Sequence, residues 1–139
     1  MSMKKFITFC DRKNLTCIRG FLEKHLTDLV SNPVLRNQII MAVDEVCSNA
    51  MIHANQCNGN ELEIRFQNSS DKIIIEVIDK GRAFNFSGYK TPEIKNIITE
   101  NRKNGLGMIL IKKIMDTVEF KRRGERNICR MSKKLVIGN

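Results

Sequence analysis

Apolar residues recur at helical spacing twice in the first half of the chain. The first series, between residues 14 and 30, places apolar positions three or four residues apart, which predicts an amphipathic helix. The second series follows Asn32 and Pro33, a pair suited to the N-cap and first turn of a helix, and it predicts a helix to about residue 54. The apolar positions are Leu15, Ile18, Leu22, Leu26 and Leu29 in the first series and Ile39, Val43, Val46 and Ala50 in the second.

Strand patterns precede and follow these two helices. Residues 6–10 predict a short first strand, and residues 61–66 alternate strictly between apolar and charged side chains, as a half-buried strand does. Residues 72–79 are almost continuously apolar, which is typical of a strand inside a sheet. The polar turn at 68–71 predicts that the last two strands form a hairpin.

The second half of the chain contains a third helix and a second hairpin. The apolar spacing predicts the helix at residues 105–116. The hairpin is predicted to pair residues 118–122 with 127–135 across a turn at 123–125.

Residues 80–104 are long and polar, and they leave room for a short helix at 92–99. Connections of this length in compact domains are usually functional or disordered. Hairpins give antiparallel neighbours, whereas the step from the strand at 72–79 through the third helix to 118–122 suggests a parallel crossover. We therefore expect one domain over residues 1–139, with an α+β fold. Its architecture would be a two-layer sandwich in which a mixed, mostly antiparallel sheet has its helices packed on one face.

The composition fits a globular domain and indicates where it works. Of 139 residues, 42% are hydrophobic and 28% charged, and no apolar run reaches the roughly 20 residues of a membrane span. The N-terminus lacks the features of a signal peptide. Five scattered cysteines without a C-x-x-C pair argue against a disulfide framework or a zinc site. We expect a cytoplasmic chain with reduced, mostly buried thiols.

The chain is strongly basic, because 24 basic residues against 15 acidic ones give a net charge of +9. Such a charge favours a polyanionic partner, for example nucleic acid, a nucleotide or an acidic protein; a lysine-rich solvated surface explains it equally well. The basic residues are dispersed apart from a cluster at 121–126, and no aromatic residues are interleaved to stack on bases. The charge alone leaves both interpretations open.

Three local motifs contain candidate chemistry, and the first lies on the second helix. Glu45, Asn49 and His53 are spaced four residues apart, so they form one polar stripe beside the apolar stripe of that helix. A polar stripe at the edge of a buried face is suited to the wall of a pocket. Taken alone, the same stripe also fits the solvated flank of a helix, and His53 fits a structural, hydrogen-bonding histidine.

The other two motifs contain glycine. Asp79 ends an apolar strand and is followed by Gly81, so its carboxylate can face a cleft and accept a hydrogen bond from an exocyclic amine such as that of adenine. An ordinary turn is the alternative. Gly105 and Gly107 open the third helix, where glycines and free N–H groups favour a phosphate, although a tight loop-to-helix turn has the same pattern. The lysine of a P-loop is absent from this motif.

Jointly, the three motifs resemble the nucleotide-binding boxes of the GHKL (Bergerat-fold) ATPase superfamily. The matching stretches are E-x-x-x-N-A-x-x-H-A at 45–54, D-x-G-x-A-F at 79–84 and N-G-L-G-M-x-L-I at 104–111, in that order. Within the superfamily, the short chain and the segment 105–120 look like the anti-sigma-factor serine/threonine protein kinases. The resemblance covers nearly the whole chain, and it implies a Bergerat ATP-binding fold with ATP and Mg²⁺ as cofactors.

The resemblance also implies a role for each matching residue. Glu45 would be the general base that takes the proton of a serine hydroxyl, and Asn49 would be the Mg²⁺ ligand and part of the nucleotide site. Asp79 would read adenine, with Gly81 giving the base room. The remaining nucleotide-contacting positions would be His53, Ala83, Asn104, Gly105, Leu106, Gly107, Met108 and Asn127, and residues 84–104 would form a mobile lid.

Two positions depart from the family pattern. Ala83 stands where many relatives have a second glycine, which is tolerated unless the backbone there has a positive φ. Asn127 occupies the late-strand position where a threonine usually assists adenine binding, so here an amide would take the place of a hydroxyl. The net charge of +9 is also higher than the family leads us to expect.

The function implied by the resemblance is that of an ATP-dependent protein-serine kinase acting as an anti-sigma factor. As a homodimer it would hold a sigma factor inactive and phosphorylate a serine of an anti-anti-sigma antagonist of the STAS fold. Arg19, on the first helix, matches roughly where relatives contact partners.

Three other functions remain open at this stage. A nucleotide-gated binding module without kinase activity is the main alternative, although gating alone would not require Glu45 as a base. A stand-alone histidine-kinase-like ATPase domain is the second, but His25 lacks the flanking pattern of a phosphoacceptor. Nucleic-acid binding is the third, and only the charge suggests it.

Overall fold

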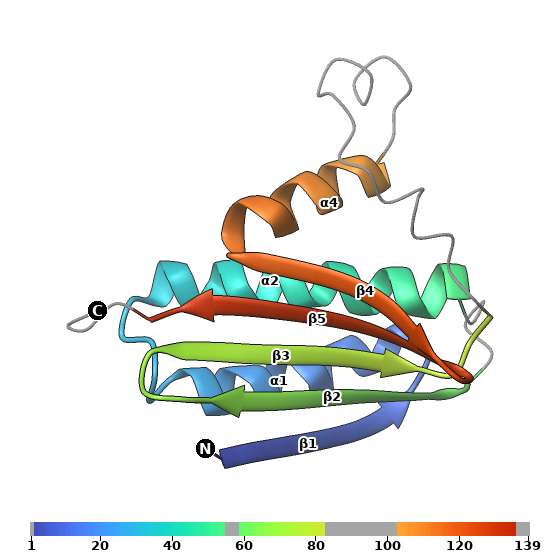
Figure 1. The fold of residues 1–139 in the computed structure, drawn as a ribbon, viewed down its shortest axis with the longest axis horizontal. Coiled ribbons are helices and arrows are strands. Elements are labelled where there is room, and N and C mark those ends of the chain that lie inside the picture. Colours follow the sequence, from blue (N-terminus) through green and yellow to red (C-terminus); the bar gives the residue numbers. More distant parts are fainter. Residues whose placement is uncertain (1, 55–58, 83–102, 136–139) are drawn as a thin grey trace.

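The computed structural model describes residues 2–54, 59–82 and 103–135, which form one sheet covered by a layer of helices (Figure 1). In chain order the elements are β1 (Ser2–Phe9), a 3-10 turn η1 (Arg12–Asn14), α1 (Leu15–Leu26), α2 (Pro33–Asn49), a π-helical turn η2 (Ala50–Ala54), β2 (Glu61–Asn68), β3 (Lys72–Asp79), α4 (Lys103–Ile114), β4 (Thr117–Arg123) and β5 (Arg126–Lys134). The predicted α+β two-layer fold is confirmed. The short helix expected at 92–99 lies outside the described residues.

The five strands follow the order β1-β2-β3-β5-β4, and every neighbouring pair is antiparallel. The expected parallel neighbours are therefore not formed. The chain does cross from β3 through α4 to β4, and these two strands run in the same direction, but β5 lies between them and pairs with both. The tight turn after β4, in which Gly124 has a φ of 59°, makes β5 the neighbour of β4, and the other edge of β5 pairs with β3.

Helix α2 begins where its sequence predicts. The side chain of Asn32 accepts hydrogen bonds from the backbone N–H groups of Val34 at 2.9 Å and Leu35 at 3.4 Å, and Pro33 is the first helical residue. Asn32 thereby satisfies two of the N–H groups that the first turn of any helix leaves without a helical partner. The capping residues thus fix where α2 begins. The helical period then determines which of its side chains face the core.

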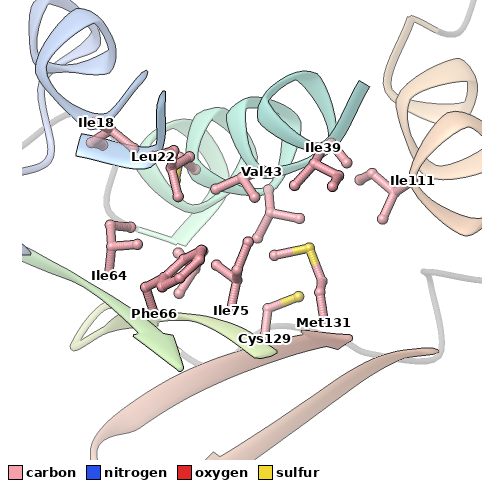
Figure 2. Packing of buried hydrophobic residues seen from close by; sticks show 14 of the residues in the cluster. Ile18, Leu22, Ile39, Val43, Ile64, Phe66, Ile75, Ile111, Cys129 and Met131 are labelled. Carbon is pink, nitrogen blue, oxygen red and sulfur yellow. The ribbon is translucent and has the colours of Figure 1, made fainter. Parts of the chain in front are cut away.

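The core lies between the helices and one face of the sheet (Figure 2). Alternate residues of the strands point into it, and they meet apolar residues from all three helices α1, α2 and α4. The labelled contributors are Ile64, Phe66, Ile75, Cys129 and Met131 from the sheet and Ile18, Leu22, Ile39, Val43 and Ile111 from the helices. Burial of this surface orients α2 and α4 over the sheet.

The cysteines were predicted to be reduced and mostly buried, and three of the four described ones are buried. Cys10, Cys47 and Cys129 are buried thiols and Cys17 is an exposed thiol, and none of these four forms a disulfide. Burial raises the pKa of the Cys47 and Cys129 thiols, which keeps both protonated and unreactive. Cys57 lies outside the described residues. Within the described ranges, no helix is long and apolar enough to span a membrane.

Two valines of α2 offer a matched test of this core. Val43 is fully buried, whereas Val34 in the first turn is 63% exposed. We expect Val43→Ala to lower the free energy of unfolding by about 1–3 kcal/mol, because it removes buried methyl groups and leaves a cavity. Val34→Ala should change it by less than about 0.5 kcal/mol. Urea denaturation measures both, and equal effects would contradict the placement of α2.

Candidate functional site

Glu45 and Asn49 lie one turn apart on α2, at the edge of its buried face. Asn49 is buried, with 6% of its surface exposed, and Glu45 is half-buried. The predicted stripe is therefore confirmed for these two residues. Burial raises the pKa of Glu45, and the neighbouring charge of Asp44 raises it further. A carboxylate whose pKa is shifted upward is a better proton acceptor near neutral pH than an ordinary one.

Gly107 is the residue of α4 that faces this carboxylate. A Cβ at position 107 would overlap Glu45 Oε2 and would lie only 3.0 Å from Glu45 Cδ. Only glycine lets the two groups meet at this point without moving the carboxylate. The predicted contact of this glycine with a phosphate stays a prediction; in the structure, the space that a side chain would fill is occupied by the Glu45 carboxylate. Either way, the glycine motif and the Glu45 motif come together, because α2 packs against α4.

The regular α-helix ends at Asn49, one turn before His53. From Ala50 to Ala54 the helix widens into the π-helical turn η2, which follows directly on α2. The predicted α-helix to residue 54 is therefore correct only to Asn49, because a π-helical turn shifts the later side chains around the helix axis. The structure describes the backbone of His53 but not its side chain. Its predicted contact with the nucleotide stays a prediction.

Asp79 ends β3 at the helix-covered side of the sheet and is buried, with 3% of its surface exposed. Its Oδ1 accepts a hydrogen bond from the backbone N–H of Gly81 at 2.8 Å. Asn127, directly opposite on β5 and equally buried, donates from Nδ2 to the same oxygen at 2.9 Å. Sequence analysis predicted both residues for the adenine site, and the structure places them in contact.

Arg122 is a residue of this cluster that sequence analysis did not single out. It lies opposite Asn127 in the β4–β5 hairpin, and its Nη1 donates to Asn127 Oδ1 at 2.9 Å. The signal was available in the sequence, since a hairpin turning at Gly124 pairs position 122 with position 127. It was missed because Arg122 lies in the basic cluster at 121–126, and the sequence alone does not show which of these basic residues faces the site.

Arg19 is half-exposed on α1 and forms a two-pronged ion pair with Asp44 of α2. Nε lies 2.8 Å from Asp44 Oδ1, and Nη2 donates to Oδ2 at 3.2 Å. A pair this exposed contributes about 1 kcal/mol or less to stability. Its more specific effect is to place a cation beside the carboxylate that raises the pKa of Glu45. Its predicted contact with a partner protein stays a prediction.

The remaining predicted positions are only partly described. Met108 is buried on α4, with 3% exposed. The backbone of Asn104, Gly105 and Leu106 lies in the first turns of α4, which begins two residues earlier than predicted, but their side chains lie outside the description. Ala83 and the predicted lid up to residue 102 lie outside it altogether.

The donor set around Asn49 fits a weakly held magnesium ion rather than a metal cage. Within 2–54, 59–82 and 103–135, no group of three or more His, Cys, Asp or Glu residues could hold a metal. Mg²⁺ commonly binds proteins through one or two oxygen ligands while keeping waters and phosphate oxygens. The amide oxygen of Asn49, one turn from Glu45, matches that mode, which requires a phosphate ligand to complete it.

His25, the histidine considered as a phosphoacceptor, is part of an aromatic cluster. Its ring packs on Phe66 at a centroid distance of 5.6 Å and edge-on to Phe21 at 4.7 Å. Burial and the nearby Lys24 and Lys4 lower its pKa, so the ring is neutral at physiological pH. These contacts give His25 a structural role.

Removing the charge of Asp44 should lower the pKa of Glu45, because that charge is the second cause of its upward shift. Asp44→Asn should therefore move the titration of Glu45 to lower pH, as followed by carboxyl ¹³C NMR. Glu23→Gln removes the same charge from an exposed site on α1 and serves as the control. An unchanged Glu45 titration in Asp44→Asn would show that burial alone sets the pKa.

Comparisons with known proteins show which proteins this chain resembles. The family model of the histidine kinase-like ATPase domain matches residues 11–133. The chain is 34% identical over 84 residues to the serine-protein kinase RsbW of Bacillus mycoides (strain KBAB4), which covers 58% of this chain and 52% of that protein. It is also 34% identical over 86 residues to RsbW of Bacillus velezensis, with coverages of 57% and 52%. The chain thus spans about half the length of the curated relatives it matches.

Solved structures show the same fold at low sequence identity. The structure of the RsbU and RsbW domains of a Mycobacterium tuberculosis protein matches 97% of this chain and 33% of its own, with a TM-score of 0.68 and 11% identity. A chain of the SiaB–SiaC complex of Pseudomonas aeruginosa matches 95% of this chain and 89% of its own, with a TM-score of 0.60 and 11% identity. Because the family model covers residues 11–133, nearly the whole sequence, the chain belongs to the histidine kinase-like ATPase domain family.

Proposed function

We propose that this protein is an ATP-dependent protein-serine kinase of the anti-sigma-factor type. The observation that supports this most is the meeting of Glu45 with Gly107. A half-buried carboxylate with a raised pKa lies one turn from Asn49 and directly against the glycine motif that opens α4. A domain that only bound a nucleotide would have no use for a proton acceptor at this point.

The proposed reaction transfers the γ-phosphoryl group of ATP to a serine hydroxyl. The serine oxygen forms the new bond to phosphorus, the bond to the β-phosphate oxygen breaks, and ADP leaves. Glu45 accepts the proton of the serine hydroxyl during the attack. Mg²⁺, when bound, supplies positive charge to the phosphates, and Asn49 is the residue that would hold it. Asp79 accepts a hydrogen bond from the exocyclic amine of adenine and so fixes the base.

The proposed partners follow from the relatives. The curated proteins it resembles are named serine-protein kinases, and we extend that activity to this chain. The protein substrate would be a STAS-type anti-anti-sigma protein, and the protein held inactive would be a sigma factor in the cytoplasm. Arg19 is the candidate contact, because it is half-exposed on α1 and joined to the helix that carries Glu45.

We also propose that the protein is a homodimer. β1 lies at the edge of the sheet, and it exposes Met3, Ile7 and Phe9, which are 49%, 52% and 55% accessible. These side chains alternate along one strand, so they share the face of the sheet opposite the helices. Apolar side chains gathered on an open edge strand are typical of a surface that pairs with another chain.

Dimerisation through β1 predicts a specific sensitivity. Ile7→Asp should reduce the mass in sedimentation equilibrium from that of a dimer to the 16.0 kDa of one chain. Met41→Asp is the matched control, since Met41 is 50% exposed on α2, away from β1. A wild-type mass of one chain would remove the dimer from the proposal, and equal effects of both variants would remove β1 as its interface.

We expect substitutions of Glu45 and Asn49 to impair different properties, namely phosphoryl transfer and nucleotide binding. Glu45→Gln keeps the size of the side chain but removes the base, so it should bind Mg-ATP while serine phosphorylation falls by about 10²–10⁴-fold. Asn49→Ala should instead weaken Mg²⁺-dependent ATP binding itself. ATP affinity by calorimetry and transfer of labelled phosphate to a STAS-type substrate measure the two properties separately.

Both side chains lie on one stripe of one helix, so a general folding defect would damage both properties in both variants. If Glu45→Gln phosphorylates the substrate at the wild-type rate, the kinase mechanism is wrong. A chain that binds Mg-ATP and its partner but transfers no phosphate would instead be a nucleotide-gated binding module.

A further inference from the structure

Four side chains form one row across the ends of the strands, on the side that faces the helices. Leu62 of β2 pairs with Asp79 of β3, Asp79 with Asn127 of β5, and Asn127 with Arg122 of β4. The last three are polar, and each hydrogen-bonds to the next. The residue proposed to read adenine is therefore one member of a chain of contacts that ends at a guanidinium.

Hydrogen-bonding partners on both sides determine the orientation of the Asn127 amide. Its nitrogen faces only acceptors, namely Asp79 Oδ1 at 2.9 Å, the carbonyl oxygen of Arg82 at 3.0 Å and that of Gly81 at 3.4 Å. Its oxygen accepts from Arg122 Nη1 at 2.9 Å. The reverse orientation would turn the amide oxygen toward three acceptors and the amide nitrogen toward a donor. Arg122 therefore stabilises the one orientation in which Asn127 donates to Asp79.

The Asp79 carboxylate is positioned by this amide. Oδ1 receives the N–H of Gly81 and the amide of Asn127, so the plane of the carboxylate is fixed by two donors on one oxygen. Arg122 Nη1 also donates to the carbonyl oxygen of Gly81 at 2.9 Å, which ties down the backbone just after Asp79. Within the described part of the chain both of these donors bind Oδ1, so Oδ2 is the oxygen that can accept from a ligand.

We propose that Arg122 is a positioning residue for base recognition, acting through Asn127 on the carboxylate of Asp79. The inference rests on the proposed function, in which Asp79 reads adenine. Without Arg122, the Asn127 oxygen loses its donor and the carbonyl oxygen of Gly81 loses one of its partners, so the amide is held from its nitrogen side alone and fixes the carboxylate less firmly. The site loses its preference for a base that offers a donor at this point.

Inosine 5′-diphosphate provides the probe for this preference. It differs from ADP mainly in having a carbonyl oxygen where adenine has its exocyclic amine, so a fixed carboxylate repels it. The ratio of ADP affinity to inosine diphosphate affinity, measured by calorimetry in magnesium buffer, reports recognition of the base alone. Contacts with the phosphates are common to both ligands and cancel from the ratio.

The experiment compares Arg122→Met with Arg123→Met on the full chain. Both variants remove one arginine from the same hairpin, but only Arg122 faces Asn127. We expect the affinity ratio to fall by about tenfold in Arg122→Met, because a charge-assisted hydrogen bond is lost, and to stay unchanged in Arg123→Met. Arg122→Lys should recover part of the ratio, since one ammonium can still donate to Asn127 Oδ1. An equal loss of affinity for both ligands would overturn the proposal and indicate a phosphate contact.

A double variant tests whether Arg122 acts through Asn127. Asn127→Leu should lower the ratio by itself, and adding Arg122→Met should then lower it little further; independent effects that multiply would overturn the proposal. Asp79→Asn tests the proposed adenine site separately from the proposed role of Arg122. If Asp79→Asn lowers ADP affinity by at least about tenfold while Arg122→Met leaves the ratio unchanged, only the role of Arg122 is wrong. If Asp79→Asn leaves ADP affinity unchanged, the adenine site itself is wrong.

Discussion

The packing of α2 on the sheet, between α1 and α4 in the helix layer (Figure 2), determines the geometry of the candidate site. An amphipathic helix cannot rotate without exposing its apolar face, and here that face is fully covered: Ile39, Ala42, Val43 and Cys47 have no exposed surface. Because the rotation of α2 is fixed, Glu45 and Asn49 are held at the border of the core, where they are partly desolvated. The absence of a side chain at Gly107 then allows α4 to close against Glu45. The raised pKa of Glu45 is a consequence of this packing.

A second constraint operates at the ends of the strands, where polar groups are buried. A buried amide or carboxylate is costly unless its hydrogen bonds are made. Asp79 and Asn127 meet this requirement by bonding to each other and to the backbone that follows β3. Arg122 completes the arrangement from a partly exposed position, because its long side chain spans from the hairpin to the buried amide. The amide of Asn127 makes this network possible, because it donates to Asp79 on one side and accepts from Arg122 on the other.

Local patterns in the sequence were sufficient for most of the fold. The capping pair Asn32 and Pro33 placed the start of α2, and the alternation of residues 61–66 identified the strand β2 and its buried face. The position of β5 between β3 and β4 could not be predicted in the same way. Strand order depends on contacts between distant segments, and a crossover motif alone does not show which strand will fill the gap.

The same distinction applies to the site. Spacing on one helix was enough to group Glu45 with Asn49, because a helix has a fixed period. The contact of Glu45 with Gly107 joins two helices far apart in sequence, and the local motif could suggest only a phosphate. The change to a π-helical turn after Asn49 was missed because the sequence there has good helix formers and contains no glycine or proline to mark it.

The position of β1 has a consequence for how the chain folds. Among the described strands β1 pairs with β2 alone, and Cys10, just after β1, hydrogen-bonds to Glu61, 51 residues later. Both α1 and α2 lie within the loop that this pairing closes. Closing a long loop costs chain entropy before any contact is gained, whereas the hairpins β2–β3 and β4–β5 close locally. During synthesis, β1 emerges from the ribosome before β2, so this edge strand remains without its partner until α1, α2 and β2 have all been made.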